Sequence, residues 1–197
     1  MPRGRLTREA VIDAAARIAD AEGLERLTIA RLAEELGIRG PSLYNHVEGR
    51  DQLLRELGLR GLREYQAALT TAAVGRSRDD ALLAVAAAHR HYAQEHPGLY
   101  AATIRAPDPE DRERVEAADA ALAVILAVLA GYGLEGEDAI HAARALRSAL
   151  HGFSSLEAAG GFGMPTDRDE SFESMVDMLA AGMAVTQPAP TRARRGS

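Results

Sequence analysis

The chain of 197 residues has no cysteine, no tryptophan and no lysine, and aromatic residues make up only 4% of it. Without cysteine, the sequence excludes disulfide bonds, thiolate chemistry and cysteine-type zinc sites. No apolar run approaches the roughly 20 residues that span a bilayer. The longest such run, at 117–130, is better interpreted as a buried helix. Because the segment MPRGRLTREA also lacks the apolar core of a signal peptide, we expect a cytoplasmic protein without a membrane partner.

Alanine and leucine are abundant instead, and hydrophobic residues amount to 47% of the chain. This composition supports a real core and favours helices that pack closely on small side chains. The sequence contains no run of alternating β-branched residues that would indicate a strand. It therefore predicts an all-α protein.

The net charge of -6 is unevenly distributed along the chain. Residues 1–63 hold 11 arginines and 10 acidic residues, a balance of +1, whereas residues 64–197 hold 12 arginines and 19 acidic residues, a balance of -7. Because the local field decides the attraction to phosphates, the acidic total does not exclude nucleic acid as a partner of the N-terminal part.

Periodic apolar residues, caps and breakers predict about nine helices. Thr7 and Thr28 are suited to cap the first two helices, while Gly23 and Gly37 are suited to end them. The expected helices cover about residues 8–22, 29–36, a two-turn stretch from 41, 50–73, 78–95, 99–105, 110–130, 136–159 and 169–184. Within the first helix, Val11, Ile12, Ala15, Ile18 and Ala19 share one face.

The most informative segment is 28–54, which has the order helix, glycine turn, short helix, glycine turn, helix. Two helices joined by so tight a turn form the unit that places its second helix in the DNA major groove. In the short helix, Leu43 and Val47 must face the neighbouring helices. The polar residues Ser42, Tyr44, Asn45 and His46 then point outward, as a surface that reads bases and holds phosphates requires.

These residues resemble the N-terminal domain of the TetR/AcrR family of one-component regulators. The resemblance covers roughly residues 7–55 and rests on Thr28, Leu36-Gly37-Ile38, Pro41-Ser42-Leu43-Tyr44-Asn45-His46-Val47 and Arg50-Asp51-Gln52-Leu53-Leu54. Two positions depart from the family pattern: Val47 replaces a phenylalanine, and Arg50 replaces a lysine while keeping its charge.

The resemblance and the side-chain chemistry together assign two roles in binding an operator in double-stranded DNA. Hydroxyl, imidazole and guanidinium groups that would bind phosphates belong to Thr28, Ser42, Tyr44, His46 and Arg50. Residues placed to meet base edges are Arg39, Gly40 and Asn45. Arg3 and Arg5 suit either a minor-groove arm or an idle tail.

The C-terminal half resembles a TetR subgroup marked by a Trp-His-Gly motif, through His151-Gly152-Phe153, Leu156-Glu157 and Gly160-Gly161-Phe162, although the tryptophan is missing. The resemblance implies a largely apolar cavity for a small, lipophilic effector. The candidate lining residues are Tyr92, Tyr100, Ile104, Leu126, Leu129, His141 and Phe153. Each of these side chains would equally suit plain core packing.

The resemblance also implies a homodimer in which the last two helices pair with their two-fold mates, matching a palindromic operator. The apolar stripes expected at this interface are Leu146, Leu150, Phe153 and Leu156, and Phe172, Val176, Leu179 and Met183. The alternative is that one of the stripes serves only the core of the chain.

Enzyme motifs are missing: the chain has no G-x-S-x-G elbow, no phosphate-binding loop and no dinucleotide fingerprint. The histidine pairs lack the spacing and carboxylate partners of metal ligands, so we expect no metal and no cofactor. We therefore predict a three-helix helix-turn-helix DNA-binding domain at 1–55, a larger helical effector-binding and dimerisation domain at 56–185, and a disordered tail at 186–197. The predicted function is a repressor released from its operator by a small molecule; the alternative is a helical ligand-binding protein without operator specificity.

Overall fold

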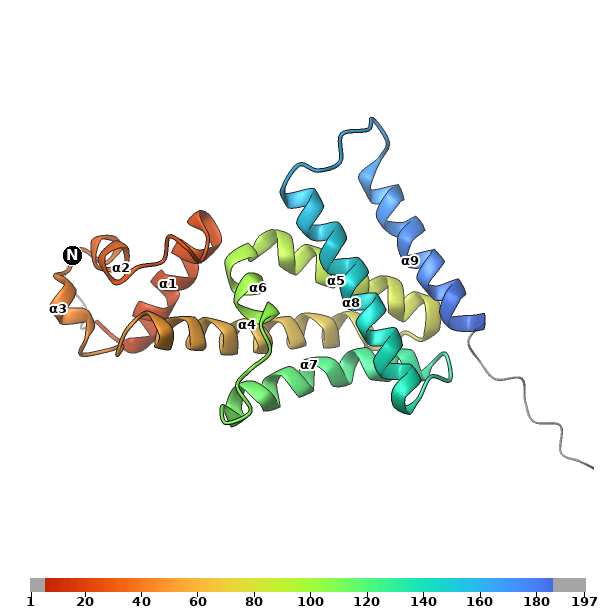
Figure 1. Ribbon diagram of the computed structural model, residues 1–197, viewed down its shortest axis with the longest axis horizontal. Coiled ribbons are helices and arrows are strands. Elements are labelled where there is room, and N and C mark those ends of the chain that lie inside the picture. The colour runs from red at the N-terminus through yellow and green to blue at the C-terminus, as the bar shows by residue number, and fades with distance from the viewer. Residues whose placement is uncertain (1–5, 186–197) are drawn as a thin grey trace, which may run out of the picture. The chain divides into compact units, whose positions relative to one another are not determined.

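The computed structural model describes residues 6–185, which form nine helices and no strand (Figure 1). The helices are α1 (Arg8–Glu22), α2 (Ile29–Glu35), α3 (Gly40–Leu43), α4 (Arg50–Ala73), α5 (Arg78–Glu95), α6 (Pro97–Ile104), α7 (Arg112–Ala130), α8 (Gly136–Ala158) and α9 (Arg168–Val185). The all-α prediction is confirmed. The arginines of the predicted arm and the predicted tail lie outside the described residues.

The chain folds into two compact units. The first consists of the described residues up to Leu69 together with His91–Ala121, and the second of Thr70–Arg90 together with the described residues from Leu122 onward. Helices α4, α5 and α7 therefore each contribute residues to both units. The domain boundary that the sequence suggests at residue 55 concerns function and stays a prediction.

In the first unit, α1 begins and ends at the predicted residues. The hydroxyl of Thr7 accepts a hydrogen bond from the backbone N–H of Ala10 at 3.1 Å. Gly23, with a φ of 87°, ends the helix and donates its N–H to the carbonyl of Ala19. The apolar face predicted for this helix is buried throughout: Val11, Ile12, Ala15, Ile18 and Ala19.

Helix α6 begins at Pro97, two residues earlier than expected, because α1 supplies its cap. Proline needs no donor at the first helical position. The carboxylate of Asp20 on α1 accepts hydrogen bonds from the N–H groups of Gly98 at 2.9 Å and Leu99 at 3.0 Å. These are the orphan donors of the first turn of α6, so the start of α6 is held by α1.

Glycines allow α6 to approach both α1 and α4 at backbone distance. A Cβ atom added to Gly98 would overlap the backbone of Ala19 on α1. On α4, a Cβ at Gly61 would lie 2.8 Å from the carbonyl oxygen of Leu99, and one at Gly58 would lie 3.0 Å from that of Ala102. Both distances are shorter than an ordinary contact, so no larger residue fits these positions without movement of the backbone.

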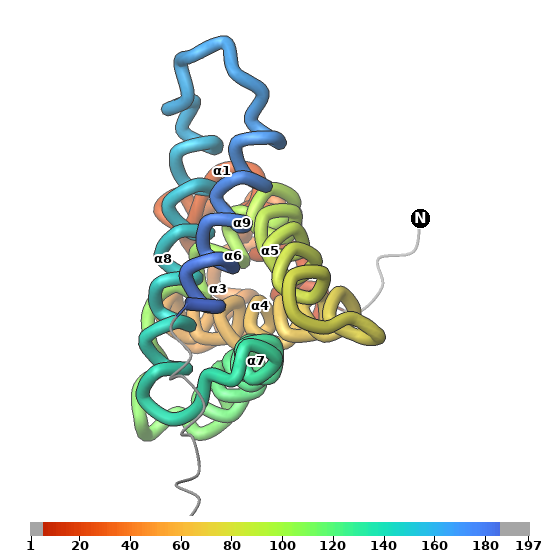
Figure 2. The backbone as a smooth tube through the Cα atoms, turned by 90° about the vertical axis from the view of Figure 1, so that its right-hand side faces the viewer, coloured from red at the N-terminus to blue at the C-terminus, as the bar shows by residue number. Residues whose placement is uncertain are grey.

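In the second unit, α8 and α9 run antiparallel and side by side, as Figures 1 and 2 both show. Their rings meet edge-on, with the centroids of Phe153 and Phe172 5.1 Å apart. Arg90 of α5 completes this cluster: its guanidinium lies 4.9 Å from the ring centroid of Phe172 and makes two hydrogen bonds, of 2.8 and 2.5 Å, to the carboxylate of Glu157. The half-buried charge of Arg90 is thus held by a bidentate partner.

His89, also on α5 in the second unit, is almost completely buried. Burial lowers its pKa to about 4, and the positive charges of His151 and Arg147 add to the shift. The side chain is therefore neutral in the folded protein near neutral pH.

We expect Gly98→Ala to lower the free energy of unfolding by about 1–3 kcal/mol, the usual cost of overpacking, because the methyl group has no room against Ala19. Gly163→Ala is the matched control, since this exposed loop glycine has open space around its Cβ and an ordinary φ. Urea unfolding measures both changes. Equal stability of Gly98→Ala and the parent protein would contradict the close contact.

The buried His89 makes stability depend on pH. An unfolded chain takes up this proton near pH 6.5, whereas the folded protein resists it until about pH 4, so stability falls as the pH drops between these values. The loss reaches at most about 3 kcal/mol, at roughly 1.4 kcal/mol for each pKa unit. Urea unfolding of His89→Gln should show a shallower dependence over this window than the parent protein. The exposed control, His141→Gln, should keep the parent slope.

Candidate nucleic-acid interface

Helix α2 and the turn that follows it have the predicted capping chemistry. The hydroxyl of Thr28 accepts a hydrogen bond from the N–H of Arg31 at 3.0 Å. At the other end, Gly37 takes a φ of 63°, and two backbone bonds, from Gly37 to Glu34 and from Ile38 to Ala33, close the helix. This is the glycine-dependent ending known as a Schellman motif, and it aims the chain into α3.

Helix α3 is shorter than the expected two turns: it spans four residues and continues as a turn through His46. Its two apolar anchors, Leu43 and Val47, are buried as predicted. Ser42, just before Leu43, and Tyr44 and Asn45, between the two anchors, are exposed. The side chain of Tyr44 is 59% exposed, so most of a large ring faces solvent although no fold requirement places it there.

The arginines of this region divide into those used within the chain and those left exposed. Arg31 makes hydrogen bonds of 2.7 and 3.0 Å to Glu22 and one of 3.1 Å to Glu35. This partner lowers the pKa of the Glu22 carboxyl. Among the described residues the side chain of Arg39 has no hydrogen-bond or ion-pair partner, and it is exposed on the turn before α3. Arg39 is therefore available to an external anion.

Arg50, which the sequence suggested as a phosphate ligand, has a second task. Its Nε donates to the carbonyl of Leu27 and its Nη2 to that of Leu24, each at 2.9 Å. The guanidinium thereby fastens the start of α4 to the loop between α1 and α2. Its contact with DNA stays a prediction, in which Nη1, the guanidinium nitrogen not used in these two bonds, would face the phosphate.

The residues predicted for the effector cavity lie in different units. In the first unit, Tyr92 and Tyr100 flank Tyr65, with ring centroids 5.6 and 6.4 Å from it. The hydroxyl of Tyr92 donates to the carbonyl of Gly61 at 3.3 Å, and burial raises its pKa. Ile104 is exposed.

In the second unit, Leu129 is buried, Leu126 is half-buried and His141 is exposed. Phe153 packs against Phe162 and Phe172 in the cluster described above. The buried members of this set serve the core of their own unit, Ile104 and His141 do not, and an effector cavity lined by the set stays a prediction.

Most of the side chains predicted for the dimer interface are buried within the described chain, and the interface itself stays a prediction. The buried members are Leu146, Leu150, Phe153, Phe172, Val176 and Met183, while Leu179 is half-buried. Only Leu156, at 52%, is exposed. The physical reason is that α8 and α9 bury these side chains against each other and against their neighbours in the second unit.

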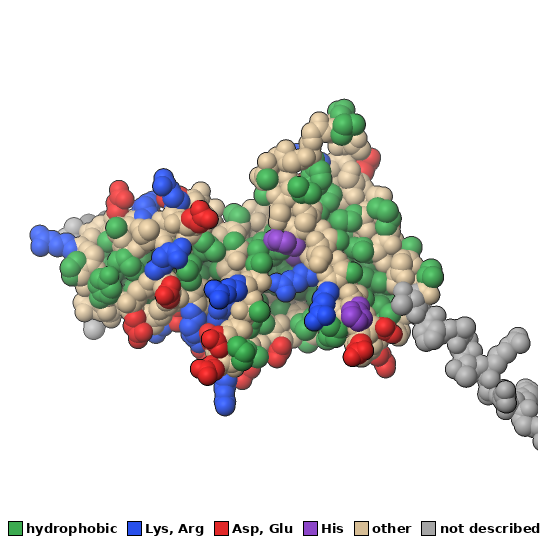
Figure 3. Space-filling model, in the orientation of Figure 1, with side chains coloured by type: hydrophobic (Ala, Val, Ile, Leu, Met, Phe, Trp, Pro, Cys, Tyr) green, Lys and Arg blue, Asp and Glu red, His purple; other side chains and the backbone are tan. Residues whose placement is uncertain are grey.

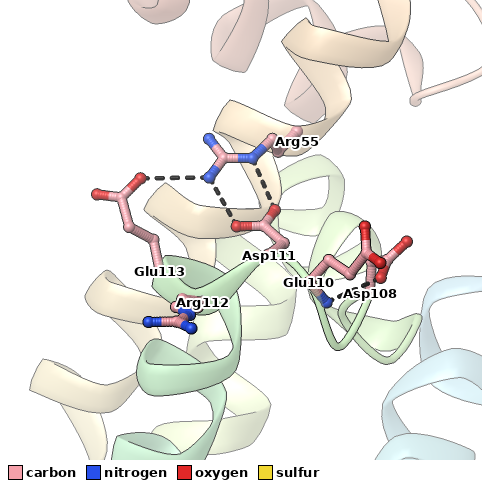
Figure 4. A pocket seen from close by; sticks show the side chains of 6 residues that line it. All are labelled: Arg55, Asp108, Glu110, Asp111, Arg112 and Glu113. Atoms are coloured by element: carbon pink, nitrogen blue, oxygen red, sulfur yellow. Dashed lines mark hydrogen bonds and ion pairs between the residues drawn. The ribbon is translucent and has the colours of Figure 1, made fainter.

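A network that sequence reasoning missed joins α4 to the start of α7 in the first unit (Figure 4). Arg55 makes two hydrogen bonds of 2.6 Å to the carboxylate of Asp111 and one of 3.2 Å to Glu113. The guanidinium lowers the pKa of Asp111. No local sequence signal pairs residues that stand 56 positions apart.

Comparison with known proteins matches two segments of the chain. Residues 11–57 match the family of bacterial regulatory proteins called the tetR family, and residues 82–179 match the tetracyclin repressor-like C-terminal domain. The uncharacterized HTH-type transcriptional regulator Rv0681 of Mycobacterium tuberculosis is 44% identical over 180 residues, which is 91% of this chain and 82% of that protein. This chain belongs to the TetR family.

Two further relatives agree with the assignment. The uncharacterized HTH-type transcriptional regulator YobS of Bacillus subtilis is 36% identical over 184 residues, covering 93% of this chain and 96% of that protein. The crystal structure of the regulatory protein SCO4313 is 29% identical, with a TM-score of 0.70 over 87% of this chain and 94% of that one. The TetR-family resemblance seen in the sequence is confirmed, whereas the Trp-His-Gly subgroup stays a prediction.

As a TetR-family member, the chain is a DNA-binding transcriptional regulator, the role that its relatives carry in their names. Within residues 6–185 no helix is both long and apolar enough to cross a membrane. The same residues contain no group of three or more histidine and acidic side chains arranged to hold a metal ion.

Proposed function

We propose that this TetR-family regulator is a repressor that binds a palindromic operator as a homodimer and leaves it when a small, lipophilic molecule binds. The observation that carries the proposal is the exposed polar face around α3. Tyr44, Ser42 and Asn45 stand in solvent on a turn that Leu43 and Val47 fix to the core. Arg39 adds an unpaired cation at the entrance to that turn. We expect the protein to act in the cytoplasm, where the DNA is.

The side chains at this face suit the two kinds of DNA contact. Thr28, Ser42, Tyr44 and His46 carry groups that donate hydrogen bonds to phosphate oxygens and so set the register on the duplex. Asn45 and Arg39 match adenine and guanine edges, respectively, in the major groove. Gly40, half-buried and without a side chain, permits a close approach of the backbone.

Effector release requires a path from the body of the protein to the recognition face. The close contacts of α6 with both α1 and α4 supply a candidate, since α6 is capped by Asp20 and packed on Gly58 and Gly61. A ligand that shifts α6 would therefore displace the two helices on which α2 and α3 are built. A coupling free energy of about 1–3 kcal/mol is typical of such systems.

The outward faces of α8 and α9 are our candidate for the dimer interface. Along α8 the exposed or half-exposed row is Ala145, Ser148, Gly152 and Leu156, and along α9 it is Ser174, Met178, Ala181, Gly182 and Val185. These small and apolar residues carry no charge, as a surface that is buried in a dimer requires. Figure 3 shows hydrophobic side chains exposed over this helix pair and its loop.

Substitutions in the turn that follows α3 separate the two kinds of DNA contact. Tyr44→Ala should weaken binding to all duplexes by roughly 10-fold, the scale of one lost hydrogen bond to a charged group. Asn45→Ala should also relax sequence preference, by about 1–3 kcal/mol at one base pair. The measurement is fluorescence anisotropy at fixed salt with the upstream intergenic fragment and shuffled competitors. Val74→Ala, exposed and far along the sequence, is the control.

If Tyr44→Ala bound the intergenic fragment and the shuffled competitors as tightly as the parent protein does, α3 and its turn would not be the recognition element. If the parent protein showed no preference for any fragment, the alternative of a ligand-binding protein without operator specificity would hold instead.

The dimer interface is tested by placing a charge on each of two exposed apolar residues. Met178→Arg should dissociate the dimer or weaken it at least about 10-fold, because an unpaired charge would be buried. Val74→Arg, at a site of similar exposure (70% against 67%), should leave the dimer intact. Sedimentation equilibrium measures the mass. A monomeric parent protein, or a Met178→Arg variant that stays dimeric, would contradict this interface.

A further inference from the structure

The first unit contains a cavity of about 580 Å³ that the helix-turn-helix role does not explain. It lies among the turn after α1, the first turns of α4, the end of α6, the α6–α7 connection and the start of α7. None of the residues predicted for the effector cavity lines it. Its size is that of a small-molecule site.

Three arginines line this cavity: Arg55, Arg105 and Arg114. Arg55 is already satisfied, since it turns to Asp111 and Glu113 in the network of Figure 4. Two acidic residues, Asp51 and Asp108, also line the cavity, and the carboxylate of Asp108 accepts a hydrogen bond from the N–H of Glu110 at 2.9 Å. The cations that remain for a ligand in the cavity are therefore Arg114 on α7 and Arg105 just after α6.

Arg114 is the decisive residue. Its Nε is fully buried and has no acceptor among the described residues. Its Nη2 lies 3.0 Å from the position of a Cβ on Gly58, so the guanidinium rests on α4 at the side-chain-free surface of that glycine. A buried charged donor without an acceptor is unfavourable by itself. Because this Nε has no accessible surface, an anion in the cavity would meet the guanidinium through its other two nitrogens.

The remaining walls are apolar. Leu24 and Leu54 line one part of the cavity, and Ala101 and Ala102 of α6 line another. Guanidinium groups bind carboxylates through paired, charge-assisted hydrogen bonds, and the apolar walls favour a hydrocarbon body. The two features together select an anion with an apolar part rather than an inorganic ion.

We propose that this cavity binds a small organic carboxylate, with its head group on Arg114 and Arg105 and its short apolar body against Leu24 and Leu54. Bound there, the molecule touches the first turns of α4 and the end of α6, the same helices that the glycine contacts join. An effect of the carboxylate on operator affinity rests on the proposed function, whereas its binding to the protein does not.

Isothermal titration calorimetry of the full chain, without DNA, tests the site with three probes: octanoate, octan-1-ol and acetate. Octanoate should bind once per chain, and the two others should bind at least about 10-fold more weakly, because each lacks one half of the recognised chemistry. Equal binding of octan-1-ol and octanoate would overturn the role of the arginines. Absence of binding by all three probes would overturn the site.

Charge removal at matched positions locates the binding. Arg114→Met and Arg105→Met should each weaken octanoate about 10- to 100-fold, the range for a lost hydrogen bond between charged groups. Arg112→Met is the control, because this exposed arginine lies on the same helix and does not line the cavity. Equal weakening by Arg112→Met would mean that only net charge matters and would overturn the proposal.

The two arginine variants also separate this site from DNA binding. In both variants, octanoate affinity and DNA binding without octanoate are measured separately. If octanoate affinity stays at the parent value while DNA binding weakens, these arginines serve the duplex and the proposal is wrong. Arg105→Met keeps the test decisive if the more buried Arg114→Met fails to fold, because Arg105 is exposed.

Discussion

The close packing of α6 on α1 and α4 is the constraint on which the rest of the first unit depends. Gly98 lies on the backbone of Ala19, and Asp20 holds the first two free N–H groups of α6. Because α1 and α4 also carry the core to which Leu43 and Val47 are anchored, the position of α3 is set by the same contacts. A shift of α6 would therefore pass to α1 and α4 through backbone contacts, which yield much less than flexible side chains.

Charge in this region mainly positions the helices. Arg31 binds Glu22 and Glu35, Arg50 binds two backbone carbonyls, and Arg55 binds Asp111. The ion pairs of Arg31 contribute little to stability, but they occupy a cation that DNA could otherwise meet. The face around α3 is consequently populated by hydroxyl, amide and phenol groups, with Arg39 as an accessible cation. Such a face provides geometry and hydrogen bonds, and less of the unspecific attraction that a dense basic patch would provide.

The parts of the fold that sequence predicted well are those set by local chemistry. The capping hydroxyls of Thr7 and Thr28 and the ending glycines Gly23 and Gly37 act within a few residues, so they fix helix bounds without knowledge of the tertiary structure. The start of α6 was missed because its cap comes from Asp20, which stands 78 residues away.

Tertiary partners explain the other differences. An apolar stripe on α8 has the same pattern whether it packs on α9 of its own chain or on a partner, so the sequence did not reveal that Leu146 and Leu150 are covered internally. Likewise, nothing in the local sequence shows that the long side chain of Arg50 folds back onto the carbonyls of Leu24 and Leu27. Only the tertiary structure distinguishes the exposed row that includes Met178 from the buried apolar stripe of the same helix.

The roles proposed for α3 and its turn depend on recognition of a particular DNA sequence. Binding of the purified full chain to a labelled fragment of its own upstream intergenic region, at stated salt concentrations and with excess unrelated competitor, measures this recognition. We expect a saturable complex that survives the competitor and weakens gradually with salt. Sequence recognition would be contradicted if binding to this fragment were weak and any competitor removed it equally well at moderate salt.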